Sequence, residues 1–518
     1  ASSRAARPVR PTLTLVIGLG FLAYVHGTFA VFPVTIACVA YLLAKRTAGT
    51  RYATPAAWAY AVLVLVIKER GHRYMRFGSL LGSEFRWLDM YTGEYGWHAG
   101  LNLVVLRLVS FHLDLHWATL EKQRPSGAPK LQAPKHKPEL QPEGCSAEYA
   151  NRVVDALPLG EYSLANCLAH AFYVPLYLAG PTVTFNAFAS QMARPQTAHR
   201  AGYVATYAIR LVCMVICLEL GTHWSPCFAL GASGAFVSTG PFEIGLLAYL
   251  TLNLMWFKFT IIWRFARLWA LLDGVEVQEN MVRGMNNNYS LVGFWKGWHR
   301  SFNRWLVRYI YVPLGGTSYR SLNVWVVFGF VAVWHDVEPK LLAWGGMNAL
   351  FMSVEAAIVP WAARTQTPLV RMLREGPFWR HACAASGTSY ILVLMVVNLT
   401  GYGVGIEGTM YFLQQLFSVQ GLQVGLGTFA FLFSATMFMF AIREVDEGRA
   451  GRGRSREQKG QVNSKAVKDG AGGTSGADAK GGGGVDDDGE SDGDGWRGDA
   501  LIATVTLLTV AMGWLQSQ

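Results

Sequence analysis

The stretch GLGTFAFLFSATMFMFAI, Gly425–Ile442, contains no charged side chain. It approaches the roughly 20 apolar residues that an α-helix needs to cross the hydrocarbon core of a bilayer. Similar runs recur along the chain, and several are shorter than a full span, which is typical of tilted, broken or re-entrant elements. They are Thr12–Val25, Phe29–Leu43, Ala53–Ile67, Leu164–Leu178, Tyr203–Leu220, Ile244–Phe259, Leu322–Trp334, Leu341–Pro360, Gly387–Leu399 and Ala500–Leu515. The pattern predicts an all-α, polytopic transmembrane helical bundle of about ten spans.

Composition excludes a string of soluble domains. Of the 518 residues, 52% are hydrophobic and only 15% are charged, whereas a soluble domain usually carries about 25% charged residues. The net charge of +11 fits basic loops that face anionic lipid on the cytoplasmic side better than it fits nucleic-acid binding. We therefore expect the chain to lie in the membrane bilayer and to have no nucleic-acid partner.

Three polar segments interrupt the apolar runs. Glu121–Gly144 is rich in proline and charge, which indicates a solvated loop. Asp273–Arg308 mixes aromatic and basic residues and predicts an ordered loop or interfacial helices. Glu444–Gly498 is a low-complexity segment of glycine and charge, which predicts disorder because it has too little apolar surface to bury. The expected parts are a transmembrane domain over 1–442, a disordered insert over 443–499 and a C-terminal transmembrane helix over 500–518.

An apolar stripe at three- and four-residue steps runs from Trp97 to Phe111, with Arg107 off the stripe. This pattern predicts an amphipathic helix at the membrane interface. His112 and His116 follow at a spacing found in metal sites, but no third ligand accompanies them. Two interfacial histidines are the favoured interpretation, and no metal site is expected.

An ionisable residue inside an apolar run is a candidate functional group, because burying it in a membrane is costly. The run FGFVAVWHD, Phe328–Asp336, places His335 at the end of an apolar stretch, between Trp334 and Asp336. Imidazole accepts and donates protons near neutral pH, and burial favours its neutral form, which a general base requires. The alternative from the residues alone is a hydrogen-bonded histidine at a helix end.

A second candidate is FWKGWHRSFNRWLVRYIYVPLGG, Phe294–Gly316, whose aromatic and basic residues suit a membrane interface. Arg300, Arg304 and Arg308 are four residues apart and would share one helical face, which could hold phosphates. The alternative is that these arginines reach out to lipid headgroups. Asn303 lies on the same expected helix, and its amide both donates and accepts hydrogen bonds.

These segments resemble the membrane-bound O-acyltransferase (MBOAT) superfamily. Members carry a segment like WHRSFNRW, here Trp298–Trp305, then one like RYIYVPLGG, here Arg308–Gly316, and about thirty residues later a histidine, here His335. VAVWHDVEPKLLAWGGMNAL looks most like the glycerol-uptake-protein branch, which is related to Hedgehog acyltransferase. Trp87–Ala118 and Glu161–Phe188 look like that branch as well. The resemblance runs from about residue 53 to residue 442.

The resemblance implies a helical bundle around a tunnel through the membrane, with acyl-CoA as co-substrate and no other cofactor. The family's catalytic histidine maps to His335 and its partner to Asn303. Arg300, Arg304 and Arg308 become candidates to hold the CoA phosphates, and Trp298 and Trp334 become candidate walls of the acyl tunnel. His299 is a rival base, and Asp336 is grouped with the substrate-binding residues as a candidate to orient His335. Adjacent helical residues point about 100° apart, which argues against a direct contact between Asp336 and His335.

Three classes of function remain open at this stage. The first is transfer of an acyl group to a lipid hydroxyl, with the lyso-phosphatidylinositol of a glycosylphosphatidylinositol (GPI) anchor as the leading acceptor, in the endoplasmic reticulum membrane. The second is protein acylation, as in Hedgehog acyltransferase, where Asp usually stands in place of Asn303. The third is transport of glycerol or another small solute, which would not require the pair of Asn303 and His335.

Overall fold

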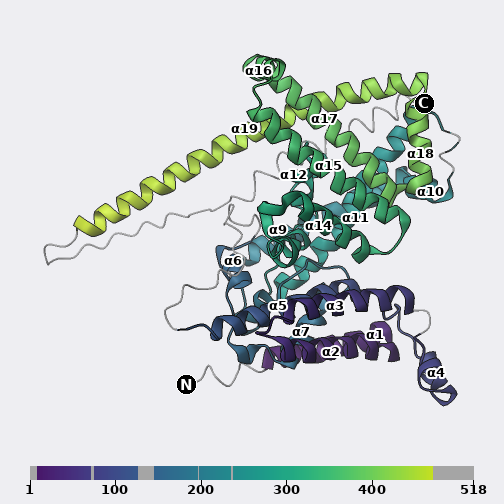
Figure 1. Cartoon of the computed structure of the whole chain (residues 1–518), viewed down its shortest axis with the longest axis vertical. Helices are drawn as coiled ribbons and strands as arrows, with labels where there is room; N and C mark the ends of the chain where they lie inside the picture. Colours follow the sequence, from purple (N-terminus) through teal and green to yellow (C-terminus); the bar gives the residue numbers. More distant parts are fainter. Residues whose placement is uncertain are drawn as a thin grey trace. The chain divides into compact units, whose positions relative to one another are not determined.

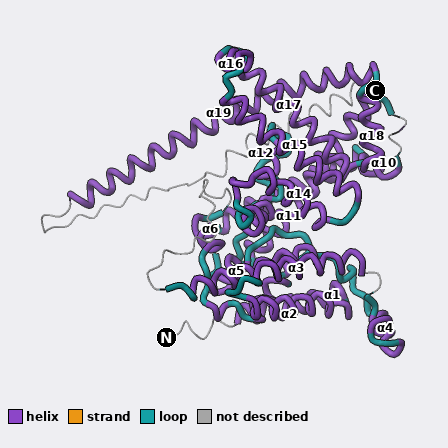
Figure 2. Tube along the Cα trace, in the orientation of Figure 1, coloured by secondary structure: helices purple, strands orange, loops and turns teal. Residues whose placement is uncertain are grey.

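Helices make up every regular element that the computed structural model describes, which covers residues 9–71, 75–125, 145–196, 198–234, 237 and 239–470. No strand occurs in these ranges (Figure 2). The α-helices are α1 (Val9–His26), α2 (Val31–Thr47), α3 (Ala53–Val66), α4 (Phe77–Leu80), α5 (Leu101–Lys122), α6 (Ala147–Val154), α7 (Leu164–Ala171), α8 (Phe185–Ala193), α9 (Ala201–Trp224), α10 (Cys227–Ser233), α11 (Pro241–Leu272), α12 (Leu291–Gly297), α13 (Arg300–Leu306), α14 (Arg320–His335), α15 (Pro339–Arg364), α16 (Pro368–Glu375), α17 (Trp379–Asn398), α18 (Gly405–Leu416) and α19 (Val419–Gly470). The predicted all-α class is confirmed.

Eight helical segments among the described residues are long and apolar enough to cross a membrane. They are Val9–His26, Thr28–Thr47, Leu101–Lys122, Ala201–Trp224, Pro241–Leu272, Pro339–Arg364, Trp379–Gly403 and Val419–Val445. The chain is therefore a multi-pass membrane protein, as predicted. The last predicted span, Ala500–Leu515, lies outside the described residues, as does most of the predicted loop Glu121–Gly144.

One predicted span, Leu164–Leu178, is broken. Helix α7 ends at Ala171, and a short 3₁₀ turn, Val174–Leu176, follows it. Pro175 explains the break, because proline lacks the N–H that a continuing helix would need.

The described residues form two compact units. The first lies within Ala1–Val282, Leu291–Ala362 and Val393–Gly421, and the second lies within Arg283–Ser290, Ala363–Leu392 and Leu422–Gln518. Helix α19 continues to Gly470. The predicted parts, which are a transmembrane domain over 1–442, a disordered insert over 443–499 and a C-terminal helix over 500–518, stay a prediction. Arginine, glutamate, glutamine, lysine and alanine, which are frequent between residues 443 and 470, all favour helix.

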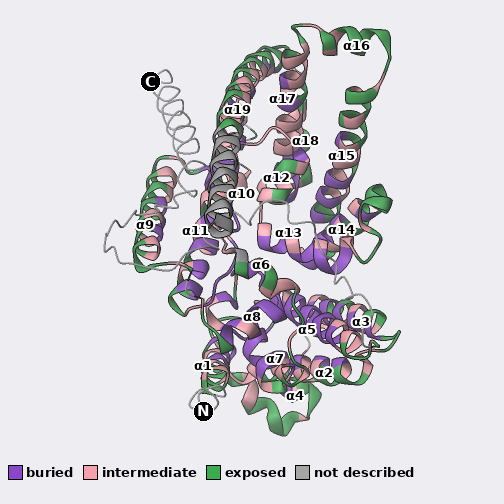
Figure 3. Cartoon of the chain, turned by 90° about the vertical axis from the view of Figure 1, so that its left-hand side faces the viewer, coloured by how far each residue is buried: buried purple, intermediate pink, exposed green. Residues whose placement is uncertain are grey.

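Helix α5 is the centre of the first unit rather than an interfacial helix, so this prediction was wrong. It packs against α2, α3, α7 and α8, and nearly all its side chains are buried (Figures 1 and 3). Its polar residues are accommodated by partners on other segments. Thr47 Oγ1 lies 2.7 Å from His112 Nε2, and the Gly49 N–H donates to His116 Nδ1 at 3.0 Å. The two histidines are therefore buried and hydrogen-bonded, and not interfacial.

The second unit packs α17 against α19. Arg380 and Glu444 form an ion pair at 2.6 Å, and Tyr289 meets Phe440 edge to face at 4.8 Å. The Arg443 guanidinium donates to the backbone oxygen of Asn287 at 2.8 Å, which ties the short segment Arg283–Ser290 to α19. Every candidate site residue lies in the first unit.

Candidate active site

His335 is the last residue of α14. Asp336 follows with φ −171° and ψ 155°, which is extended backbone and ends the helix. Pro339 then opens α15, in the first turn, where the missing proline N–H costs nothing. The imidazole therefore stands at the turn between two long apolar helices, as the position of the histidine in the sequence indicated.

Two other segments hold this turn in place. The last carbonyls of a helix have no partner within the helix, and the Asn102 side-chain amide of α5 donates to Trp334 O at 2.7 Å. The Trp334 indole N–H returns the contact, donating to Asn102 O at 2.9 Å. On the far side of the turn, Lys68 Nζ lies 2.8 Å from Asp336 Oδ1. Each anchor joins residues more than two hundred positions apart.

The Asp336 carboxylate is therefore the partner of Lys68, in agreement with the expectation that it does not contact His335 directly. Burial alone would raise the pKa of Asp336, but the hydrogen bond and charge of Lys68 lower it below its usual value. Asp336 is a negatively charged anchor of the turn, and its assignment to substrate binding stays a prediction.

Three aromatic side chains surround His335. Its ring lies 4.7 Å from that of Trp334, 5.6 Å from Tyr402 and 6.1 Å from Trp344, measured between centroids. Within the described residues, neither ring nitrogen of His335 forms a hydrogen bond with the protein. Burial lowers the pKa of this imidazole to about 4, so that it is neutral at pH 7. A neutral imidazole without a protein partner is suited to accept a proton from a substrate.

His299 has an unusual backbone conformation. Its φ is 45°, and among the described residues it is the single non-glycine residue with a positive φ. Such a conformation is strained for a residue with a Cβ, and strain of this kind clusters at functional sites. The ring stacks on Trp263 at 4.5 Å, and its Nε2 is buried and forms no hydrogen bond with any described residue. Burial, with a smaller contribution from His335, lowers the pKa of His299 to about 3.

Neighbouring backbone contacts hold His299 in this conformation. An antiparallel bridge joins Met281 to Trp298, and the Arg300 N–H donates to Asn280 O at 3.2 Å. The Asn280 side chain accepts from the Ser301 N–H at 3.0 Å, which satisfies a free N–H at the start of α13. The predicted ordering of the segment Asp273–Arg308 is thus confirmed.

Helix α13 contacts α14 through aromatic rings. The rings of Phe302 and Trp334 lie 4.4 Å apart, and those of Trp305 and Phe330 lie 6.1 Å apart, so the two candidate motifs are in contact. Asn303 is the next residue of α13 and is half-buried. Its backbone N–H donates to His299 O at 3.0 Å, while its side-chain amide makes no hydrogen bond within the described part of the chain. The amide therefore remains available for a substrate.

The environment of Arg308 differs from that of Arg300 and Arg304, because Arg308 is buried and the other two are half-buried. Helix α13 ends at Leu306, and Arg308 lies on the π-helical turn that follows, Val307–Tyr311. The Arg308 guanidinium lies 3.1 Å from Asp114 Oδ1, inside the protein. The shared face of the three arginines and their assignment to the CoA phosphates stay predictions.

Trp298 packs among aromatic rings near His299. It stacks on Phe294 at 5.5 Å and meets Trp263 edge to face at 5.7 Å. Trp334 is buried between Phe302 and His335. Both tryptophans are placed beside the candidate catalytic groups, and their assignment to an acyl tunnel stays a prediction.

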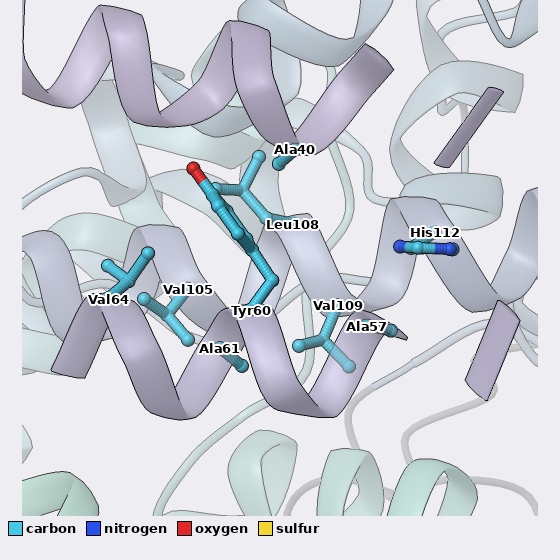
Figure 4. Close-up of a pocket in the computed structure, with 9 residues that line it drawn as sticks. All are labelled: Ala40, Ala57, Tyr60, Ala61, Val64, Val105, Leu108, Val109 and His112. Carbon is cyan, nitrogen blue, oxygen red and sulfur yellow. The ribbon is translucent and has the colours of Figure 1, made fainter. Parts of the chain in front are cut away.

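A crevice elsewhere in the first unit has no part in this arrangement. It lies between α2, α3 and α5 and is apolar apart from Tyr60 and His112 (Figure 4). The Tyr60 hydroxyl donates to Ile36 O at 2.8 Å, and His112 is paired with Thr47. Both polar groups are satisfied within the protein, so we assign no chemistry to this crevice.

Lys68, Asn102, Trp344 and Tyr402 complete the site and were missed in the sequence. Lys68 directly follows the apolar run Ala53–Ile67, and that position was the available signal. The other three are uncharged residues in apolar or amphipathic helices, where nothing local distinguishes them. Only their contacts with His335, Trp334 or each other identify them.

Residues 85–397 match the family model described as MBOAT, membrane-bound O-acyltransferase family. Membrane-bound O-acyltransferase gup1 of Schizosaccharomyces pombe is 35% identical over 447 residues, which cover 85% of this chain and 74% of the relative. GUP1 of Saccharomyces cerevisiae is 34% identical over 440 residues, covering 84% and 75%. Protein-cysteine N-palmitoyltransferase HHAT of Mus musculus is 28% identical over 253 residues, covering 46% and 50%.

Proposed function

Because this chain belongs to the membrane-bound O-acyltransferase family, we propose that it transfers a long-chain acyl group from acyl-CoA to the hydroxyl of a lyso-lipid. The observation that carries the proposal is His335: a neutral, half-buried imidazole whose nitrogens have no protein partner among the described residues. The contact of Trp334 with Phe302 brings it beside the helix that carries Asn303.

The reaction follows from these groups. The acceptor oxygen attacks the thioester carbonyl carbon while His335 takes the hydroxyl proton. A tetrahedral intermediate forms, and the Asn303 amide donates a hydrogen bond to its negatively charged oxygen. The carbon–sulfur bond then breaks, and the imidazolium of His335 returns the proton to the CoA thiolate. Arg300 and Arg304 would hold the CoA phosphates, and Trp298 and Trp334 would line the acyl chain.

We propose the lyso-phosphatidylinositol of a GPI anchor as the acceptor and the endoplasmic reticulum membrane as the location. The support is the resemblance to the glycerol-uptake-protein branch, whose two fungal relatives named above align over 84% to 85% of this chain. A protein acceptor is the second candidate, since the mouse relative is named a protein-cysteine N-palmitoyltransferase, but that likeness covers only 46% of the chain. Solute transport, the third class of function, would not require an imidazole whose nitrogens have no partner among the described residues.

The test of the reaction uses the purified protein in lipid nanodiscs with a labelled long-chain acyl-CoA. The acceptors are a panel of lysolipids, including lyso-phosphatidylinositol, and a peptide with an N-terminal cysteine. We expect label in the phosphatidylinositol product. Label that appears only in the peptide would show protein acylation in place of the proposed reaction. Hydrolysis of the acyl-CoA without transfer, or no reaction with any acceptor, would reject acyl transfer to lysolipids and to peptides.

The test of the acceptor in cells is lipid analysis of GPI anchors after deletion of the protein. We expect the anchors to accumulate in the lyso form, because the re-acylation step is missing. Reintroduced wild-type protein should restore the diacyl form, whereas the His335→Ala variant should not. Anchors that keep their normal lipid would rule out this acceptor but leave acyl transfer itself to the purified assay.

Replacing Asn303 with alanine is expected to reduce kcat by about 10²–10³, the usual effect of losing one donor to the oxyanion. KM for acyl-CoA should change little, because the hydrogen bond strengthens in the transition state. Asn151→Ala is the matched control, since Asn151 is an exposed residue of α6. If kcat of Asn303→Ala stays within twofold of the wild type, Asn303 is not the oxyanion donor.

A further inference from the structure

The Tyr402 hydroxyl is buried beside His335 and has no hydrogen-bond partner in the described part of the chain. Buried hydroxyl groups are almost always hydrogen-bonded, because leaving one unpaired loses its hydration and gains nothing. An exception next to a candidate catalytic imidazole indicates that the partner is a molecule that arrives from outside. No motif or hydropathy pattern in the sequence selects this tyrosine.

Local structure explains why Tyr402 occupies this place. It lies on a π-helical turn, Leu399–Gly403, at the end of α17. Such turns are rare within α-helices and occur frequently at functional sites, because they redirect a side chain that a regular helix would point elsewhere. The Thr400 hydroxyl donates to Val396 O at 2.9 Å, which helps to hold the irregular backbone.

Trp344 of α15 locks the turn against the site. Its indole N–H donates to Asn398 Oδ1 at 3.1 Å, and its ring meets that of Tyr402 edge to face at 5.4 Å. Gly401 permits this packing, since a Cβ at that position would lie 2.7 Å from the Trp344 ring. Tyr402 therefore reaches the His335 ring from a rigid support, which is what a preorganised hydrogen-bond donor requires.

We propose that the Tyr402 hydroxyl donates a hydrogen bond to the carbonyl oxygen of the bound thioester and stabilises the oxyanion that forms there, together with the Asn303 amide. The acceptor oxygen forms its bond to the carbonyl carbon, the carbon–sulfur bond breaks, and the proton passes through His335 to the thiolate. Tyr402 keeps its own proton throughout. This assignment rests on the proposed acyl transfer and adds to it a second donor.

The test is Tyr402→Phe in the full-length protein in nanodiscs, which removes the hydroxyl and keeps the ring that packs on His335 and Trp344. We expect kcat to fall by about 10² with KM for acyl-CoA nearly unchanged, because the hydrogen bond strengthens as charge develops. The melting temperature should stay the same or rise, since the variant removes a buried hydroxyl that has no partner. A purely structural role predicts the opposite shift in melting temperature.

The matched control is Tyr60→Phe, whose hydroxyl has a backbone partner and lies outside the site. It should leave kcat unchanged. Three results with an active wild type would reject the role of Tyr402 and leave acyl transfer standing. In these results Tyr402→Phe keeps the wild-type kcat, loses activity together with a fall in its melting temperature, or loses activity only through a higher KM. If the wild type transfers no acyl group to any acceptor, the proposed function fails, and the role of Tyr402 fails with it.

Discussion

Acyl transfer by the His335→Ala variant is expected to fall by about 10³–10⁴, to the background of the assay. General-base catalysis contributes up to about 10⁴ in rate. His335 supplies the neutral imidazole at the end of α14 that would act as this base. The side chain makes no hydrogen bond within the described residues, so its removal leaves no buried polar partner behind. The variant should therefore insert and accumulate like the wild type, which quantitative blotting and size-exclusion chromatography would measure.

The pH dependence of the wild type gives an independent check. A general base must be neutral, and burial lowers the pKa of His335 to about 4. The rate should stay level as the pH falls from about 8 to about 5 and decline only as it approaches 4, when protonation removes the base. An acid limb centred near pH 6.5 would show that the working base is not this buried histidine.

Two substitutions separate His335 from other histidines. His381→Ala is the neutral control, because His381 is exposed in the second unit, where its ring contacts those of Phe378 and Phe433. His299→Ala tests the rival base: it should lose less activity than His335→Ala. The reverse order of the two losses would transfer the role of base to His299, whose buried Nε2 also lacks a partner.

Replacing Asp114 with alanine is expected to destabilise the first unit by about 3–5 kcal/mol, the typical cost of breaking a buried ion pair. The Asp114 carboxylate accepts from Arg308 at 3.1 Å and from the Tyr309 hydroxyl at 2.9 Å. The Asn186 N–H donates to its other oxygen at 3.3 Å. Asp114 is only 1% exposed and Arg308 only 6%, so the substitution leaves a guanidinium inside the protein without its counter-charge.

A thermal melt of the purified variant, followed by loss of the monodisperse peak, measures this effect. Arg371→Ala breaks an exposed pair with Glu375 on α16 and should not shift the transition, because solvent-exposed ion pairs contribute little. The double variant Asp114→Leu with Arg308→Met should recover much of the loss, because an apolar pair leaves no buried charge. A melt of Asp114→Ala that matches the wild type would show that the pair is not needed for stability.

Hydrophobic runs predicted the membrane class well, because the cost of crossing a bilayer is summed over neighbouring residues. They were least informative where polar and apolar residues alternate. The apolar stripe with Arg107 off it predicts an interfacial helix for α5, but Arg107 donates to Ala171 O at 2.8 Å, and the two histidines that follow have partners of their own. Polar groups satisfied by distant segments are compatible with a buried helix, and the local pattern does not contain those segments.

The candidate site shows the same division. The end of an apolar run and the resemblance of short motifs were sufficient to select His335 and Asn303. The local pattern could not indicate that Arg308 pairs with Asp114, because the two residues lie 194 positions apart. The position of Lys68 after an apolar run marks it as a candidate, but its partner Asp336 and the contact of Tyr402 with His335 are known only from the tertiary structure.

The sequence by itself determined that this protein is a helical membrane protein with an imidazole and an amide in an ordered pair of motifs, since hydropathy and motif spacing are properties of contiguous residues. Only the tertiary structure decided which polar side chains are already paired and which remain available to a substrate. The reason is that each anchor of the site joins segments far apart in the chain: Lys68 and Asp336 are 268 positions apart, and Asn102 and Trp334 are 232 apart.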